Sequence, residues 1–168
     1  MDEQIINKVA ESGLLTINLE DYYPQEDIAV FDLRPLLFME MILKEKDFRL
    51  ALSQTNWDVY TEKLVAVTCS VDAVIPMWAY MLVASYLQPV ASDVVLGNVE
   101  KIRTELFLQK LRKLDLSEYT DKRVVVKGCG DLPIGEPAYL EITKLLRPIA
   151  KSIMYGEPCS TVPVFKRK

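Results

Sequence analysis

Short runs of β-branched residues alternate with helical segments through the second half of the sequence, and this alternation constrains the fold more than any other feature. The β-branched runs occupy residues 64–69, 93–96 and 121–127. A segment with helical composition follows each run, and Pro137 opens the last of these helices. Strands and helices in this order, with short connections, are typical of parallel crossovers whose strands are buried on both faces. The sequence therefore predicts an α/β fold.

Two further strands are expected near the N-terminus. Residues 14–19 alternate between apolar and polar side chains, which indicates a half-buried strand, and residues 28–32 form a second apolar run. We expect residues 1–43 to supply strands that complete one edge of the sheet, and residues 44–168 to form the crossover core and a C-terminal turn. The chain of 168 residues is expected to be a single domain, with three layers around a parallel or mixed sheet.

One uncharged segment has the length of a membrane span. Residues 73–92 carry no formal charge, and about 20 apolar residues are enough to cross a bilayer. However, Pro76 and Pro89 shorten the helical part, and the flanking charges are Asp72 and Asp93 rather than the basic residues that usually flank a span. The segment is therefore predicted to be a buried crossover helix, with no membrane association.

Composition excludes several classes of function. The chain has 20 Lys and Arg against 24 Asp and Glu, a net charge of -4, so its overall field repels nucleic acid. It has no histidine, which excludes Ser-His-Asp and Cys-His catalysis and Cys/His zinc fingers. The glycine motifs that bind phosphates and the Cys-x-x-Cys motif are absent as well. The acidic N-terminus lacks the pattern of an export signal, so we expect a cytoplasmic protein with reduced thiols.

The first two cysteines follow predicted strands. Cys69 and Cys129 each come at the end of a β-branched run, and the carboxyl ends of parallel strands meet at one edge of a sheet. If their strands are parallel, both thiols lie at the same edge. Asp72 and a predicted helix start follow Cys69, so a thiolate there would feel the positive end of the helix. Gly128 and Gly130 flank Cys129 and leave it approachable.

The third cysteine joins this edge only if the chain turns back. A continuous final helix would carry Cys159 to the opposite edge, whereas a break at Pro148 would allow it to return. Ser160 and Thr161, together with Gly156, are candidates for a turn that binds an anion. The sequence has no repeat with a period of 20 to 50 residues, and its one internal echo is the tripeptide Gly-Glu-Pro.

The cysteines form a candidate metal site. Cys69, Cys129 and Cys159, with Asp72 or a water molecule, would suit zinc, and three cysteines with an open position would suit a labile iron–sulfur cluster. Their spacing matches no standard ligand motif. Structural alternatives stay open: Cys69 is also typical of a small buried residue at a strand end, Asp72 of a helix N-cap, and the Ser-Thr pair of a helix terminator.

Several motifs resemble an uncharacterised bacterial protein family. These motifs are L-K-E-K-D-F-R at 43–49, C-S-V-D-A-V-I-P-M-W-A-Y at 69–80, K-G-C-G at 127–130 and S-I-M-Y-G-E-P-C-S-T-V-P at 152–163. The resemblance covers most of the chain and brings no established activity. It implies an association with iron–sulfur assembly, and therefore a protein partner.

These observations lead to one expected function and one alternative. We expect a cytosolic accessory protein with a cysteine-based site that binds a metal or iron–sulfur species or handles sulfur. The alternative is a non-catalytic protein-interaction module that presents the Gly-Glu-Pro turns to a partner. A thiol-dependent enzyme also stays open, with Lys127 or a helix terminus activating its thiolate in place of histidine. The substrate, the metal, the partner and the oligomeric state are not determined by the sequence.

Overall fold

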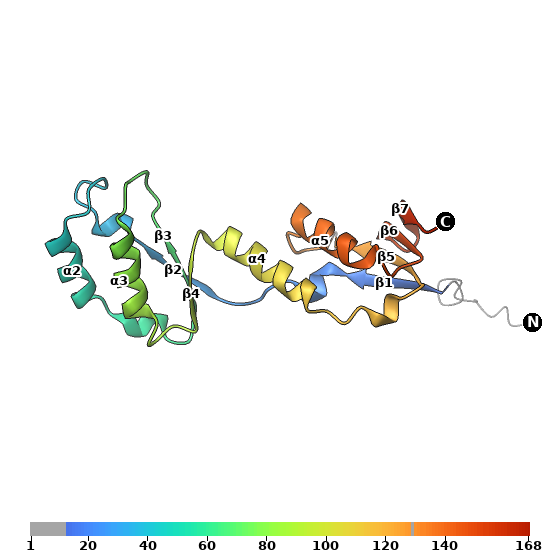
Figure 1. Cartoon of the computed structure of the whole chain (residues 1–168), viewed down its shortest axis with the longest axis horizontal. Coiled ribbons are helices and arrows are strands. Elements are labelled where there is room, and N and C mark those ends of the chain that lie inside the picture. The colour runs from blue at the N-terminus through green and yellow to red at the C-terminus, as the bar shows by residue number, and fades with distance from the viewer. Residues whose placement is uncertain (1–12, 129) are drawn as a thin grey trace, which may run out of the picture. The chain divides into compact units, whose positions relative to one another are not determined.

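The computed structural model describes residues 13–128 and 130–168, whose strands form two sheets (Figure 1). β7 is antiparallel to β6, and every other pair of neighbouring strands is parallel. The four-stranded sheet has the order β1 (Leu14–Asn18), β5 (Arg123–Lys127), β6 (Ser152–Glu157), β7 (Ser160–Lys166), and the three-stranded sheet the order β2 (Ile28–Asp32), β3 (Leu64–Thr68), β4 (Asp93–Leu96).

The chain divides into two compact units, each of which contains one sheet. Unit 1 is formed by the described residues up to Pro24 together with Thr104–Lys168, and unit 2 by Gln25–Arg103. The prediction of a single domain over residues 1–168 stays a prediction. The helices are α2 (Glu45–Gln54) and α3 (Met77–Leu87) in unit 2, α4 (Val99–Arg112) across the boundary and α5 (Glu136–Leu146) in unit 1, with short 3-10 helices at Leu19–Tyr22, Arg34–Leu36, Trp57–Tyr60 and Ser117–Tyr119.

The predicted α/β class, with mainly parallel strands joined by crossover helices, is confirmed. Among the described strands, β1 and β2 each stand at one end of the strand order of their sheet. The strands are divided between two sheets, where the sequence predicted one. Each N-terminal strand begins a different sheet, because β1 pairs with β5 and β2 pairs with β3.

The core of unit 2 lies between two helices and one face of its sheet. Apolar residues spaced by four positions lie on one face of a helix, and residues spaced by two on one face of a strand. Both spacings are found here, so the two helices pack against this face of the sheet. The buried residues are Phe48 and Leu52 of α2, Ala79, Val83 and Leu87 of α3, and Phe31, Val65 and Val67 of the sheet.

Apart from Ile17 and Ile153, the core residues in the α-helices and strands of unit 1 lie 59 positions after core residues of unit 2. The core residues of these elements in unit 1 are Phe107 and Leu111 of α4, Ala138, Ile142 and Leu146 of α5, and Ile17, Val124, Val126 and Ile153 of the sheet. Phe48 and Phe107 correspond, as do Leu52 and Leu111, and each of these pairs is identical. Helices α2 and α3 in unit 2 therefore occupy the same positions in the core as α4 and α5 in unit 1.

The backbone repeats in the same register. Residues 60–63 read Tyr-Thr-Glu-Lys and residues 119–122 read Tyr-Thr-Asp-Lys. Glu62 has a φ of 60° and Asp121 a φ of 57°, and their N–H groups donate to the carbonyls of Val90 and Ile149 at 2.9 Å in both cases. The two units thus repeat one arrangement of helices and strands. The first strand of each unit, β1 or β2, comes from the N-terminal part of the chain.

Residues 152–166 form a β-hairpin, where the sequence analysis predicted turns. α5 ends at Leu146, Pro148 follows, and β6 then runs parallel to β5. Proline cannot continue a helix because it lacks the N–H group and its ring clashes with the preceding turn. The helix therefore ends before Pro148, and β6 then carries the chain back to the carboxyl edge of the sheet.

The uncharged segment is a short crossover helix between β3 and β4. α3 covers only residues 77–87 of it, and Pro76 and Pro89 lie just outside the two ends. No helix among the described residues is long and apolar enough to cross a membrane.

Glu141 joins α5 to α4 in unit 1. Its carboxylate accepts hydrogen bonds from Arg112 Nε at 3.0 Å and from Lys144 Nζ at 3.1 Å, and the residue is 7% exposed. The hydrogen bond from Arg112, and then that from Lys144, hold the pKa of Glu141 below its usual range. The folded state therefore favours the ionised carboxylate.

The Glu141 ion pairs predict a pH-dependent stability. Because the folded state lowers the pKa, their stabilising effect is present above the usual glutamate range and is lost as the pH falls through the folded-state pKa. Glu141→Gln is expected to lower the urea midpoint at about pH 7, with a difference from wild type that shrinks towards about pH 3. Glu45→Gln, at an exposed pair with Arg49, serves as a control with little effect. A difference independent of pH would contradict this account.

Candidate thiol site at the carboxyl edge of unit 1

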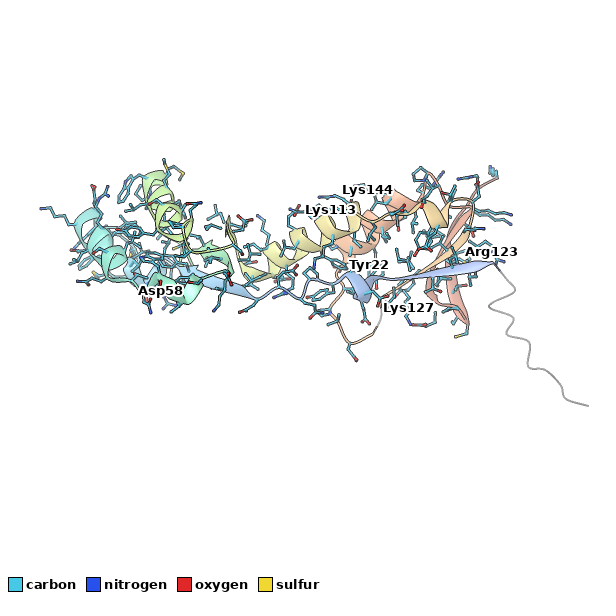
Figure 2. The ribbon with its side chains drawn as sticks, turned by 90° about the horizontal axis from the view of Figure 1, so that it is seen from below. Tyr22, Asp58, Lys113, Arg123, Lys127 and Lys144 are labelled. Carbon is cyan, nitrogen blue, oxygen red and sulfur yellow. The ribbon has the colours of Figure 1, made fainter. Side chains whose placement is uncertain are left out.

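The ends of β5 and β6 meet at one edge of the unit 1 sheet. Lys127 is the last residue of β5 and Glu157 the last of β6, and Lys127 Nζ donates to Glu157 Oε2 at 3.1 Å. Figure 2 shows Arg123 and Lys127 at the two ends of β5. This contact fixes the side of the sheet on which both following loops begin.

Gly128 and Gly130, in the loop after β5, lie close against side chains of other elements. A Cβ atom at Gly128 would lie 2.8 Å from the hydroxyl oxygen of Tyr139, and one at Gly130 would collide with the carboxylate of Glu20. Glu20 Oε1 also accepts a hydrogen bond from the N–H of Leu132 at 3.1 Å. Glu20, which the sequence analysis missed, therefore holds the loop, and no local sequence pattern connects it with a loop more than 100 residues away.

Cys159 lies at the tip of the β6–β7 hairpin and is exposed. Pro158 and Cys159 form the two-residue connection, since Glu157 pairs with Ser160. Ser160 and Thr161 belong to β7, so they do not terminate a helix, and their role in an anion-binding turn stays a prediction. Gly156, which pairs with Thr161, has a φ of 119° that other residues rarely adopt.

Cys69 and Asp72 belong to unit 2. Cys69 is half-buried, and its Sγ donates to the carbonyl of Val71 at 3.4 Å. α3 begins only at Met77, with Pro76 as its N-cap. The predicted helix start beside Cys69 is therefore wrong, and Asp72 is not an N-cap, because an extended loop separates β3 from the helix.

The carboxyl edge of unit 2 is held by Asp32, at the end of β2. Its Oδ1 accepts hydrogen bonds from the N–H groups of Arg34 and Ser70, both at 3.0 Å. Burial alone would raise the pKa of Asp32, but the hydrogen bonds from Ser70 and Arg34 outweigh it, so the pKa is lowered. An ionised Asp32 thus ties the end of β2 to the loop that contains Cys69.

The predicted site residues are therefore divided between the units. Unit 1 brings Lys127, Gly128 and Gly130 to the same sheet edge as the hairpin that carries Cys159. Cys129 lies outside the described residues, so the three-cysteine site with Cys69 stays a prediction. Among the residues that the structure describes, no group of three or more Cys, Asp or Glu is arranged to hold a metal ion.

An apolar cavity of about 320 Å³ lies beside β6 and α5 in unit 1. The rings of Tyr139 and Tyr155, on its wall, meet edge to face with centroids 5.7 Å apart. Tyr139 also contacts the position of Gly128, so the cavity adjoins the loop at the carboxyl edge. The remaining lining residues are Val126, Thr143, Ile153, Met154 and Val164.

Comparisons with known proteins identify the family of the chain but assign it no activity. No curated protein and no solved structure matches the chain. Residues 3–167, nearly the whole sequence, match the family described as protein of unknown function DUF2480, and the chain belongs to this family.

Proposed function

We propose that the carboxyl edge of unit 1 is the thiol site of a cytosolic accessory protein, at which Cys129 and Cys159 bind a metal or iron–sulfur species or carry sulfur. The supporting observation is the parallel pairing of β5 and β6 together with the 3.1 Å contact between Lys127 and Glu157. These place the hairpin that carries Cys159 beside the end of the strand that leads to Cys129.

The side chains at this edge suit thiolate chemistry. Thiolates favour zinc and iron–sulfur species, and zinc also accepts carboxylate ligands. Glu20 and Glu157 are two carboxylates at this edge, and Lys127 supplies a positive charge that attracts a thiolate or persulfide anion. A fuller ligand set with Cys69 and Asp72, as the sequence predicts, would need both units.

Analysis of the full chain purified without oxygen tests this function. We expect roughly one bound zinc or iron per chain, or a persulfide on Cys129 or Cys159, seen by elemental analysis, absorption spectroscopy and mass spectrometry. A protein with no metal, no chromophore and no persulfide would end the proposal.

An exposed apolar turn in unit 2 favours the alternative, a protein-interaction module. Met39 and Glu40 have φ values of 51° and 58°, and Phe38, Met41 and Ile42 beside them are each more than 40% exposed. Strained backbone and clustered exposed apolar residues both occur at interaction sites. If native alkylation labels none of the cysteines and metal is absent, this alternative is preferred.

A further inference from the structure

The outer edges of β6 and β4 occupy equivalent places in the two copies but differ in what covers them. In unit 1 the edge of β6 pairs with β7, whereas in unit 2 no strand of the described residues pairs with the outer edge of β4. The N–H of Gly97 donates to the carbonyl of Val67 on β3. The backbone N–H and C=O groups of successive residues in a strand point to opposite sides. Those of Val94 and Leu96 therefore point away from β3, towards the open edge of β4.

Unit 2 has a cavity where β7 packs in unit 1. Phe165 pairs with Ile153, and the guanidinium carbon of Arg147 lies 3.7 Å from the centre of its ring. The residues equivalent to Ile153 and Arg147 are Val94 and Gln88, and both line a cavity of about 360 Å³. Its other lining residues are Ala84, Ala91, Ser92 and Asp93.

Lys166 follows Phe165 in β7, and the residue it pairs with also has an equivalent in unit 2. Lys166 pairs with Ser152 in unit 1, and the equivalent of Ser152 is Asp93, an exposed carboxylate. Asp93 Oδ1 accepts the N–H of Val94 at 2.8 Å, which protects the open edge from unspecific pairing. A lysine opposite Asp93 would draw the carboxylate away and release that N–H group.

The last anchor of β7 is Arg167. It donates to the carbonyls of Pro148 and Ile149 at 3.1 Å and 3.0 Å and forms an ion pair with Asp121. The equivalent groups in unit 2 are the carbonyls of Pro89 and Val90 and the exposed carboxylate of Glu62. The backbone of Glu62 has the same left-handed conformation as that of Asp121. Unit 2 therefore has the same types of acceptor group for an arginine as unit 1.

We propose that the open edge of β4 binds an extended segment of a partner protein, antiparallel to β4 and with an aromatic residue followed by lysine and arginine. The aromatic ring fills the cavity at Val94 and Gln88, the lysine faces Asp93, and the arginine reaches Glu62. Strand addition of this kind takes affinity from backbone hydrogen bonds and specificity from side-chain pockets. The inference is independent of the thiol site, because every group it uses belongs to unit 2.

A labelled peptide with the sequence of residues 161–167, Thr-Val-Pro-Val-Phe-Lys-Arg, is the probe. Fluorescence anisotropy with the full chain is expected to show saturable binding. Leu96→Pro removes an outward N–H group, and Ala84→Phe fills the cavity, so each should weaken binding at least about tenfold. Glu62→Gln should weaken it several-fold and reduce its dependence on salt.

Control variants test whether the peptide binds at the edge of β4. Ser85→Phe adds the same bulk on an exposed position of α3 and should leave the affinity unchanged, as should the thiol variants. Circular dichroism confirms that each variant is folded. Absence of binding at about 1 mM peptide, or equal binding by all variants, would overturn the proposal. Self-association of the wild-type chain that Leu96→Pro abolishes would also overturn it, since the occupant would then be a second copy.

Discussion

Phe107→Ala is expected to lower the free energy of unfolding by about 3 to 5 kcal/mol, and Phe48→Ala by a similar amount. The two side chains are 4% and 0% exposed and occupy equivalent places in the two cores. Each also packs edge to face against another aromatic ring, Phe107 against Tyr23 and Phe48 against Trp78. Truncation therefore removes a large buried surface and leaves a cavity between helix and sheet.

The position of the tryptophans allows the two cores to be followed separately. Both tryptophans, Trp57 and Trp78, belong to unit 2, so urea unfolding monitored by their fluorescence reports that unit, while circular dichroism reports both. We expect Phe48→Ala to shift the fluorescence transition and Phe107→Ala to shift the transition seen by circular dichroism. Phe38→Ala, at a side chain that is 46% exposed, should cost about 1 kcal/mol or less.

The phenylalanine variants can contradict the assignment of the two cores or show that the units unfold together. A loss below about 1 kcal/mol for either buried phenylalanine would contradict the assignment of the cores. Coincident shifts of both probes in both variants would support the single cooperative domain that the chain length predicts.

Cys159→Ser is expected to reduce bound metal or sulfur to background, and Cys129→Ser to do the same. Serine keeps the size of the side chain but is a poor ligand for zinc or iron and cannot form a persulfide. Because Cys159 is exposed on a hairpin connection, its replacement should leave the unfolding transition within about 0.5 kcal/mol of wild type.

Cys69→Ser distinguishes the two versions of the site. If the site is confined to unit 1, this variant keeps its full content of metal or sulfur, and if Cys69 is a ligand, the content falls as it does for Cys159→Ser. Retention of all bound species by Cys159→Ser would contradict the proposed function. Metal content per chain and mass spectrometry under anaerobic conditions provide the measurement.

Local patterns were sufficient to predict most of the elements. β2 and β4 have the predicted boundaries, because each combines an apolar run with polar or glycine residues at its ends. The two sheets were not predictable in the same way. Pairing of β1 with β5 joins residues more than 100 positions apart, and no local pattern chooses between strands of similar composition.

The internal repeat was missed for a related reason. Its spacing of 59 residues exceeds the 20 to 50 residues of common repeat units, and the first strand of each copy lies outside the colinear part. The Gly-Glu-Pro echo was misleading, because the position equivalent to Gly156 is Gly97, not Gly135. Both equivalent glycines have positive φ values, which is the physical reason for their identity.

The candidate site was predicted in part. The turn at Cys159 and the glycines after β5 follow from turn-forming residues, but Glu20 and the Lys127–Glu157 contact depend on tertiary pairing. The hairpin itself was misread as turns because Pro158 and Pro163 interrupt its β-branched pattern. Pro163 is tolerated there because β7 is an edge strand.

The central claim, that Cys159 returns to the sheet edge at which β5 ends, is tested most directly by cross-linking the two unit 1 thiols. A short bifunctional thiol reagent, applied to the folded Cys69→Ser variant, should join Cys129 to Cys159 within one chain, as detected by peptide mass mapping. The same reaction in urea should give little of this product. If both thiols react with the reagent but are never joined to each other in the folded protein, the shared site does not exist.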